Sequence, residues 1–445
     1  MKNGFAVTLF VSISAAFLVS KLMLLPEPLS IKMLFLLVPA FCLFFFLNPL
    51  RGFLVFLMVR PLLDPFRSTK LLGVSVLAIT GAFIVILVIF LSLTDRRFRF
   101  FPPTPIKMMY IFFIFAMIAF MQSPDKFSSF ENLLKILSII GIYILAFNFV
   151  HKMSDVRLML RILVYSSVIP IAVGLSQALN KSGILQGGFS ELRIHSMFVL
   201  ANVFAIYLSV AMSLALYLLF DTNTGRKERF FLSVIFFSGA FCLIKTYTVS
   251  AWITFAVGCL IMCLFQKKML RIVIPMGLAV SLFFSQNLAD RIRSVTEAPK
   301  YGFNSVTFRQ DINRQLLTRA LPVHPYMGFG VGSSLRVVSR YTDFGALPHS
   351  DLVRIAIETG LIGILIYLSF ILAVFLRAVF NFAHKRVSFY DPVFFSIFVM
   401  YMILSVGTNT FYHIATSGYM FCCFGAWHKM NLLYKNEAEN EGPDL

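Results

Sequence analysis

One polar turn carries the residue best suited to chemistry. His349 lies in a Pro-His-Ser-Asp sequence, just before an apolar run that begins at Leu352. Ser350 or Asp351 is expected to cap the helix that follows, which would place the imidazole near the positive end of the helix dipole. That position disfavours the imidazolium. A neutral ring can accept a proton, so His349 is a candidate general base.

The insert that ends at this turn is unusually basic. Residues 288–350 contain eight Lys or Arg against four acids. The bases are Arg291, Arg293, Lys300, Arg309, Arg314, Arg319, Arg336 and Arg340, and the acids are Asp290, Glu297, Asp311 and Asp343. Such a surface can attach to anionic lipid headgroups. It can equally grip a phosphate-bearing ligand, because a guanidinium binds two oxygens at once.

Two features of the insert would position these groups. Residues 305–321 have helical spacing of apolar residues and predict an amphipathic helix that lies on the membrane surface. Its apolar positions are Phe308, Ile312, Leu316, Leu317 and Ala320. Glycines then alternate at 328, 330 and 332, which allows a tight bend or a close approach of backbone to a ligand. Of these two, the bend is favoured.

The rest of the chain is built from membrane spans. The sequence has 445 residues, of which 59% are hydrophobic and 13% charged, with a mean hydropathy of +0.84. Apolar runs of spanning length predict an all-α, polytopic transmembrane bundle of twelve to fourteen helices. These runs lie near residues 5–25, 31–48, 51–63, 71–93, 105–121, 131–150, 157–178, 196–220, 230–247, 249–265, 270–287, 351–378, 391–408 and 414–428. The run 51–63 is short, and we expect it to cross or to re-enter.

Basic loops set the expected orientation. Five loops rich in Lys and Arg fall on one side together with both termini, and the positive-inside rule makes that side cytoplasmic. Much of the net charge of +19 has this origin. The expected regions are spans in 1–287, a periplasmic loop at 288–350, further spans in 351–430 and a disordered cytoplasmic tail at 431–445. The first span serves as an anchor and shows no cleavable signal pattern.

Several classes of function are disfavoured. All six cysteines lie in apolar runs, where they are expected to be core residues, and their spacing is not that of metal ligands. The sequence shows no phosphate-binding loop, dinucleotide fingerprint or paired aspartates. No metal or cofactor is therefore expected, and nucleic acid is an improbable partner for an outer loop.

A family resemblance rests on residues 160–370. His324 begins a His-Pro-Tyr-Met-Gly-Phe-Gly-Val-Gly segment about sixteen residues after Arg309, and His349-Ser-Asp-Leu and Glu358-Thr-Gly-Leu-Ile-Gly follow. Arg193 begins Arg-Ile-His-Ser-Met-Phe upstream. This pattern resembles the O-antigen ligase and O-antigen polymerase superfamily. Two departures stand out: Ser350 replaces the usual Asn, and the turn at 248–252 lacks the family's arginine.

The resemblance implies a metal-independent glycosyltransferase at the periplasmic face of a bacterial inner membrane. Such enzymes transfer glycans from an undecaprenyl-diphosphate carrier to an acceptor glycan. His349 would be the catalytic base, and Arg309 would stabilise the leaving diphosphate. Arg193, Arg314 and Lys245 would assist in diphosphate binding, with Lys245 replacing the missing arginine. Membrane lipids, a chain-length regulator and a flippase are candidate partners.

Three functions remain open. A polymerase joins lipid-linked repeat units of O-antigen or exopolysaccharide and is favoured, whereas a ligase passes glycan to the lipopolysaccharide lipid A-core. A transporter would carry charges at mid-span and related halves, neither of which is evident. Among nearby residues, Arg354 is expected to snorkel and Glu358 to be a buried structural partner. An ion pair at a helix end is the expected role of Arg60, Asp64 and Arg67.

Overall fold

Helices form almost all of the structure, a computed structural model. It describes residues 45–67, 69–71, 74–103, 105–185, 192–279, 282, 289, 305–345, 347–383 and 388–440. The first two predicted spans, up to residue 44, and most of 280–304 lie outside the described residues. Two units are distinguished, Met1–Met58 and Val59–Leu445.

The first unit is described only near its end, where α3 spans Pro49–Val59. The second unit begins with the short helix η1 (Arg60–Phe66) and a hairpin of β1 (Lys70–Leu71) and β2 (Val74–Ser75). Its further elements up to the insert are α4 (Val76–Thr94), α5 (Ile106–Phe120), α6 (Lys126–Phe149), α7 (Met153–Tyr165), α8 (Val168–Leu179), α9 (Ala201–Leu219), α10 (Arg226–Lys245), α11 (Val249–Phe265) and η2 (Lys267–Met269).

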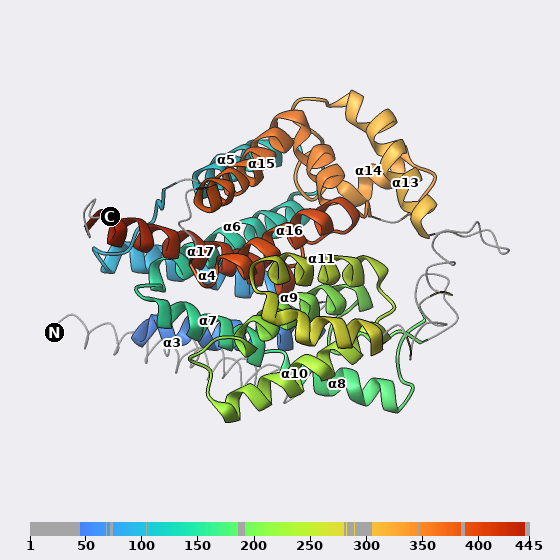
Figure 1. Cartoon of the computed structure of the whole chain (residues 1–445). Coiled ribbons are helices and arrows are strands. Elements are labelled where there is room, and N and C mark those ends of the chain that lie inside the picture. The colour runs from blue at the N-terminus through green and yellow to red at the C-terminus, as the bar shows by residue number, and fades with distance from the viewer. Residues whose placement is uncertain are drawn as a thin grey trace, which may run out of the picture. The chain divides into compact units, whose positions relative to one another are not determined.

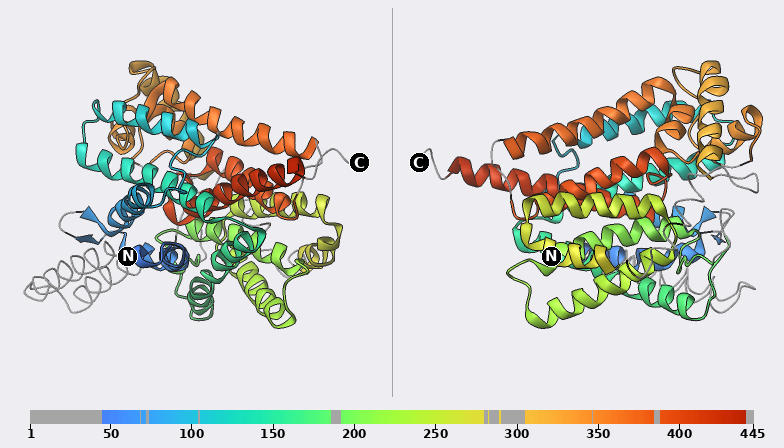
Figure 2. Two further views of the ribbon diagram at one scale, coloured as in Figure 1. Left: turned by 90° about the vertical axis from the view of Figure 1, so that its left-hand side faces the viewer. Right: turned by 45° about the vertical axis from the view of Figure 1, so that its right-hand side comes forward.

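The insert and the C-terminal helices complete the second unit (Figure 1). Its remaining elements are α13 (Ser305–Gln315), η3 (Leu316–Ala320), η4 (Leu321–Val323), α14 (Ser334–Tyr341), α15 (Asp351–Ala383), α16 (Asp391–Gly407) and α17 (Ile414–Asn440). Figure 2 shows that α17 ends on the side of this unit away from α13 and α14.

The core of the second unit lies around two helices. α9 is buried along nearly its whole length, including Ser209 and Ser213, as expected for a helix that is apolar on every side. It packs against α7, α10, α11, α16 and α17. α6 packs against α4, α5 and α17, so α17 joins the two halves of the core.

The outer faces of several helices are strongly apolar. Ile114 of α5 is 58% exposed, Leu365 of α15 is 65% exposed, and Phe237 of α10 is 54% exposed. Five helices in the described residues are long and apolar enough to cross a membrane. An exposed apolar surface of this kind needs lipid rather than water. The predicted all-α, polytopic helix bundle is therefore confirmed.

Three predicted elements differ in the structure. The run 157–178 is two helices, α7 and α8, which part just before Pro170, a residue that cannot donate a backbone hydrogen bond. α15 is interrupted at Gly360. The predicted disordered tail is helical as far as Asn440, since α17 continues through Glu-Ala-Glu, residues with good helix propensity.

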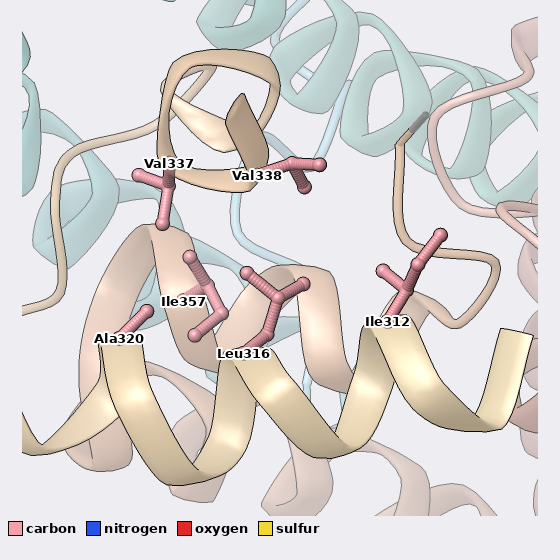
Figure 3. Close-up of a cluster of buried hydrophobic side chains, with 6 residues drawn as sticks. All are labelled: Ile312, Leu316, Ala320, Val337, Val338 and Ile357. Carbon is pink, nitrogen blue, oxygen red and sulfur yellow. The ribbon is translucent and has the colours of Figure 1, made fainter. Parts of the chain in front are cut away.

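The amphipathic helix of the insert is present, but protein covers its apolar face. Ile312, Leu316 and Ala320 are buried against Val337 and Val338 of α14 and Ile357 of α15 (Figure 3). The expectation that this face lies on the membrane surface is wrong. Helical spacing identifies an apolar stripe and does not reveal whether lipid or protein covers it.

Candidate functional site

His349 is held in place from both sides along the chain. The Ser350 hydroxyl accepts a 3.4 Å hydrogen bond from Val353 N–H, and the Ser350 carbonyl accepts one of 3.0 Å from Arg354 N–H. Ser350 is thus the cap of α15, one of the two residues expected there. On the other side, Asn409 Nδ2 donates to the Pro348 carbonyl at 2.5 Å. The backbone on both sides of His349 is therefore held at the start of α15 and just after the end of α16.

Arg309 lies close to His349. Its Nη1 donates to the Gly407 carbonyl, the last residue of α16, at 3.4 Å. Burial and, to a lesser extent, the charge of Arg309 together lower the pKa of His349 to about 4. The ring is thus neutral near pH 7, as expected. Burial and the charge of Arg309 account for this state, whereas the sequence suggested the helix dipole as its cause. The structure brings the predicted base and its predicted cationic partner together.

A second histidine lies beside this pair. His413 precedes α17, and its Nδ1 is 3.5 Å from Arg67 Nη1. Burial lowers the pKa of His413 to about 3, helped by the charges of Arg67, Arg354, Lys135 and His349. Sequence reasoning gave His413 no role, because its neighbours come from distant parts of the chain.

Lys135 was missed altogether by sequence reasoning. It lies in α6, its Nζ donates to Asn132 Oδ1 at 3.2 Å, and it is within electrostatic range of Arg67 and Arg354. α6 begins five residues before the predicted run, so Lys135 lies well inside the helix. A lysine inside an otherwise apolar span was the signal that could have identified it.

A buried ion pair in the first turns of α15 lies next to the candidate site. Arg354 Nε donates to Glu358 Oε1 at 2.9 Å, and Glu358 is fully buried. Ser334 Oγ and Tyr412 OH also donate to the Glu358 carboxylate, at 2.6 and 2.8 Å. Glu358 is therefore the buried structural partner that was predicted. Arg354 does not snorkel, since its guanidinium lies 3.6 Å above the ring of Tyr412.

The glycine-rich segment packs against the interruption in α15. Gly360 has φ 68° and ψ −171°, a conformation that is essentially restricted to glycine. Phe329 N–H and Gly330 N–H donate to the carbonyls of Ile357 and Glu358, both at 2.9 Å. A Cβ on Gly328 would lie 2.6 Å from the Gly360 nitrogen. A Cβ on Gly330 would lie 2.7 Å from Ser123 and one on Gly332 would lie 2.8 Å from Asn132 Nδ2, so the glycines form a tight bend between α15 and the start of α6, as favoured from the sequence.

Arg193 and Lys245 lie at a different turn, between α10 and α11. Arg193 Nε donates to the Thr246 carbonyl at 2.8 Å, and its Nη2 donates to Thr248 Oγ1 at 2.9 Å. Ile194 N–H donates to the Lys245 carbonyl at 3.3 Å. The guanidinium of Arg193 therefore lies at the turn where the family pattern has its additional arginine.

Arg314 and Arg60 have contrasting environments. Arg314 is exposed on α13, away from the buried face that includes Ile312. Arg60 is only 2% exposed, yet its Nε and Nη1 have no hydrogen-bond partner in the described chain. Asp64 accepts from Val199 N–H at 3.3 Å and forms no salt bridge with Arg60, so the predicted ion pair is absent between these two described residues.

Residues 231–368 match a protein family described as O-antigen ligase. Over these residues the chain is similar to that family, which is consistent with the O-antigen ligase and polymerase superfamily. The matched residues include Lys245, Arg309 and His349, whereas Arg193 lies before them. No curated protein matches the chain. The apolar helices indicate a membrane protein, and the match is consistent with glycosyltransferase-type activity on lipid-linked glycans in general.

Proposed function

We propose that this O-antigen ligase family member polymerises undecaprenyl-diphosphate-linked repeat units of a surface polysaccharide. The observation that carries the proposal is the neutral imidazole of His349 beside Arg309, above the start of α15. A base and a fixed positive charge are the two groups that metal-independent glycosyl transfer from a diphosphate requires. The site would face the periplasm, with both termini in the cytoplasm of a bacterial inner-membrane protein.

In the proposed reaction, His349 accepts the proton of an acceptor sugar hydroxyl as the hydroxyl oxygen attacks the anomeric carbon of the donor. The bond between that carbon and the diphosphate oxygen breaks, and the oxygen keeps the electron pair. Arg309 stabilises the charge that develops on the leaving diphosphate. Attack from the opposite face inverts the anomeric carbon. The proton then leaves His349 for solvent, which restores the base.

Arg193, Lys245 and Arg314 have supporting roles in the proposal. Arg193 and Lys245 share the α10–α11 turn, and we propose that this turn contributes positive charge to the donor diphosphate. Arg193 then provides there the guanidinium that the family pattern places at 248–252. The exposed Arg314 would guide the anionic part of a substrate toward Arg309 along α13.

A ligase is the second candidate, because the matched family is described by that activity. A ligase would pass finished glycan to lipid A-core instead of to another lipid-linked repeat unit. The chemistry at His349 and Arg309 would be the same, so the acceptor distinguishes the two. A chain-length regulator and a flippase remain candidate partners under either function.

The test uses purified protein in detergent with an undecaprenyl-diphosphate-linked repeat unit, and glycan length is followed on a gel. Wild type is expected to give a ladder and His349→Ala none. Arg309→Lys keeps the charge but removes the bidentate grip, so turnover should fall at least about tenfold. A normal ladder from His349→Ala contradicts the proposed mechanism. Transfer to lipid A-core without a ladder identifies a ligase.

A further inference from the structure

Next to His349 lies a group of two cations and one neutral histidine. Glu131 and Glu358 lie within electrostatic range of its lysine but form no salt bridge with it among the described residues. The group comprises Arg67 after η1, Lys135 in α6 and His413 before α17, which lie within electrostatic range of one another. No acid forms a salt bridge with Arg67 or Lys135 among the residues that the structure describes. Arg354, the other nearby cation, is already neutralised by Glu358.

Holding the positive charges of this cluster within a span costs free energy when no anion is bound. Lys135 is nine residues from the start of α6, or about 14 Å along the helix, in a candidate membrane span. Charged groups within spans are expensive and mark substrate or ion sites. Arg60 is buried near Arg67 with two nitrogens that lack hydrogen-bond partners in the described chain, and the nearby charge of Asp64 offsets only part of the cost of its burial. A bound anion would offset the mutual repulsion of these groups.

The hydrogen bonding of His413 indicates where such an anion would lie. A guanidinium can only donate, so the contact from Arg67 makes His413 Nδ1 the acceptor. The proton of the neutral ring is then on Nε2, which can donate to an oxygen of a ligand. His413 also lies within electrostatic range of His349, so this anion would lie beside the base rather than at a remote surface.

We propose that Arg67, Lys135 and His413 bind the diphosphate of the acceptor lipid, while Arg309 binds the diphosphate of the donor. The inference rests on the proposed polymerase function, in which both substrates carry a lipid diphosphate. Arg309 acts on His349 and Arg67 contacts His413, so the two proposed anion sites would each adjoin one of the two histidines. The acceptor hydroxyl would therefore approach His349 from the side of α6, and the leaving diphosphate would depart on the side of α13.

A binding measurement tests this arrangement without turnover. Native mass spectrometry of the full chain in detergent, with undecaprenyl diphosphate as the probe, is expected to show two bound lipids for wild type. The double variant Arg67→Gln with Lys135→Gln should bind one, and Arg309→Gln should also bind one. Arg340→Gln, an exposed charge on α14, is the matched control and should bind two. A single lipid on wild type, or two on the double variant, would overturn the proposal.

Competition identifies the source of the phosphate. Phosphatidylglycerol at equal concentration is expected to leave both undecaprenyl diphosphates bound. If it displaces the lipid that the double variant loses, the cluster is a phospholipid headgroup site and the proposal fails. Arg67→Lys with Lys135→Arg keeps the charges and should restore two lipids, which separates binding from misfolding.

Kinetics link the cluster to the acceptor. In the double variant, KM for the lipid-linked acceptor should rise at least about tenfold with kcat nearly unchanged, whereas a soluble acceptor glycan without phosphate should react as in wild type. An equal loss with both acceptors would count against the proposal. If wild type binds two lipids but makes no ladder, the polymerase function fails and the two-site arrangement stands.

Discussion

At the scale of single residues, the surroundings of His349 determine which form of its ring is present. Burial opposes the imidazolium, and Arg309 opposes it further, so the residue proposed to stabilise the leaving group also keeps the proposed base unprotonated. The two residues are therefore coupled, and a change in one is expected to alter the titration of the other.

That coupling predicts an acid limb in the rate profile. The pKa of His349 is about 4, below its ordinary 6.5, so the active neutral ring is present above that value and is lost as pH falls through it. The kcat/KM of wild type should be flat from about pH 8 to about pH 5 and then fall about tenfold per pH unit below about pH 4. In Arg309→Gln, the limb of the residual activity should move to higher pH. An unmoved limb would show that Arg309 does not act on the base.

The pair Arg354 and Glu358 gives a prediction for stability. Glu358→Gln leaves the guanidinium of Arg354 buried without its counter-ion, at an expected cost of about 3–5 kcal/mol in the free energy of unfolding. Denaturant unfolding in detergent measures this cost. Arg354→Met combined with Glu358→Gln removes both charges and should recover most of the loss. A single variant as stable as wild type would contradict a supporting role for the pair.

Single-sequence reasoning predicted some residues of the candidate site and did not predict others, for a physical reason. His349 and Arg309 lie in recognisable local patterns within the insert, and the cap at Ser350 is a local feature too. His413 and Lys135 gain their meaning only from packing, since α6, α15 and the end of η1 meet there from distant parts of the chain. Spacing along a sequence carries no such information.

At the scale of elements, the interruption in α15 separates a charged segment from an apolar one. Residues 351–359 include Asp351, Arg354 and Glu358, whereas 361–376 carry no charge. At about 1.5 Å per residue, residues 361–383 extend about 34 Å and can span a bilayer alone. Residues 351–359 are thus not needed to cross the bilayer and can form part of the candidate site. Sequence reasoning predicted one span here because glycine alone does not end an apolar run.

Gly360→Ala tests this architecture. The φ of 68° strains any side chain, and a Cβ would lie 2.3 Å from the Tyr326 carbonyl carbon, so a loss of about 3 kcal/mol or more is expected. Gly277→Ala is the control, because a Cβ there meets nothing within 4 Å. That helical substitution should be neutral or slightly stabilising. Equal stability of the two variants would argue against the interruption.

At the scale of the whole molecule, some loops that the predicted topology places on a common side contact each other in the second unit. On the side predicted to be outer, Ser129 Oγ donates to the Val331 carbonyl, and Arg336 Nη1 donates to the Pro124 carbonyl at 3.0 Å. On the side predicted to be cytoplasmic, Arg157 Nε donates to Asp221 Oδ2 at 2.7 Å. Hydropathy and charge bias predict a common side for these loops, because successive loops are separated by one span and therefore alternate between the two sides.

Labelling can assign the two sides. Arg340→Cys and Lys268→Cys each place a thiol at an exposed position, one on α14 and one on η2. In intact spheroplasts, a membrane-impermeant maleimide should label residue 340 at once and residue 268 only after permeabilisation. The five described native cysteines are buried, so wild type measures the background. Labelling of both positions in intact cells, or of 268 alone, would overturn the proposed orientation.

The interruption at Gly360 also has a consequence for local opening. The carbonyls of Ile357 and Glu358 are bonded to Phe329 and Gly330 and not to the next turn of their own helix. Residues 351–359 should therefore exchange their amide hydrogens together with the 325–341 segment, as one cooperative unit. The amide hydrogens of α15 after Gly360 should exchange separately and more slowly. In hydrogen exchange, α15 would thus behave as two separate helices.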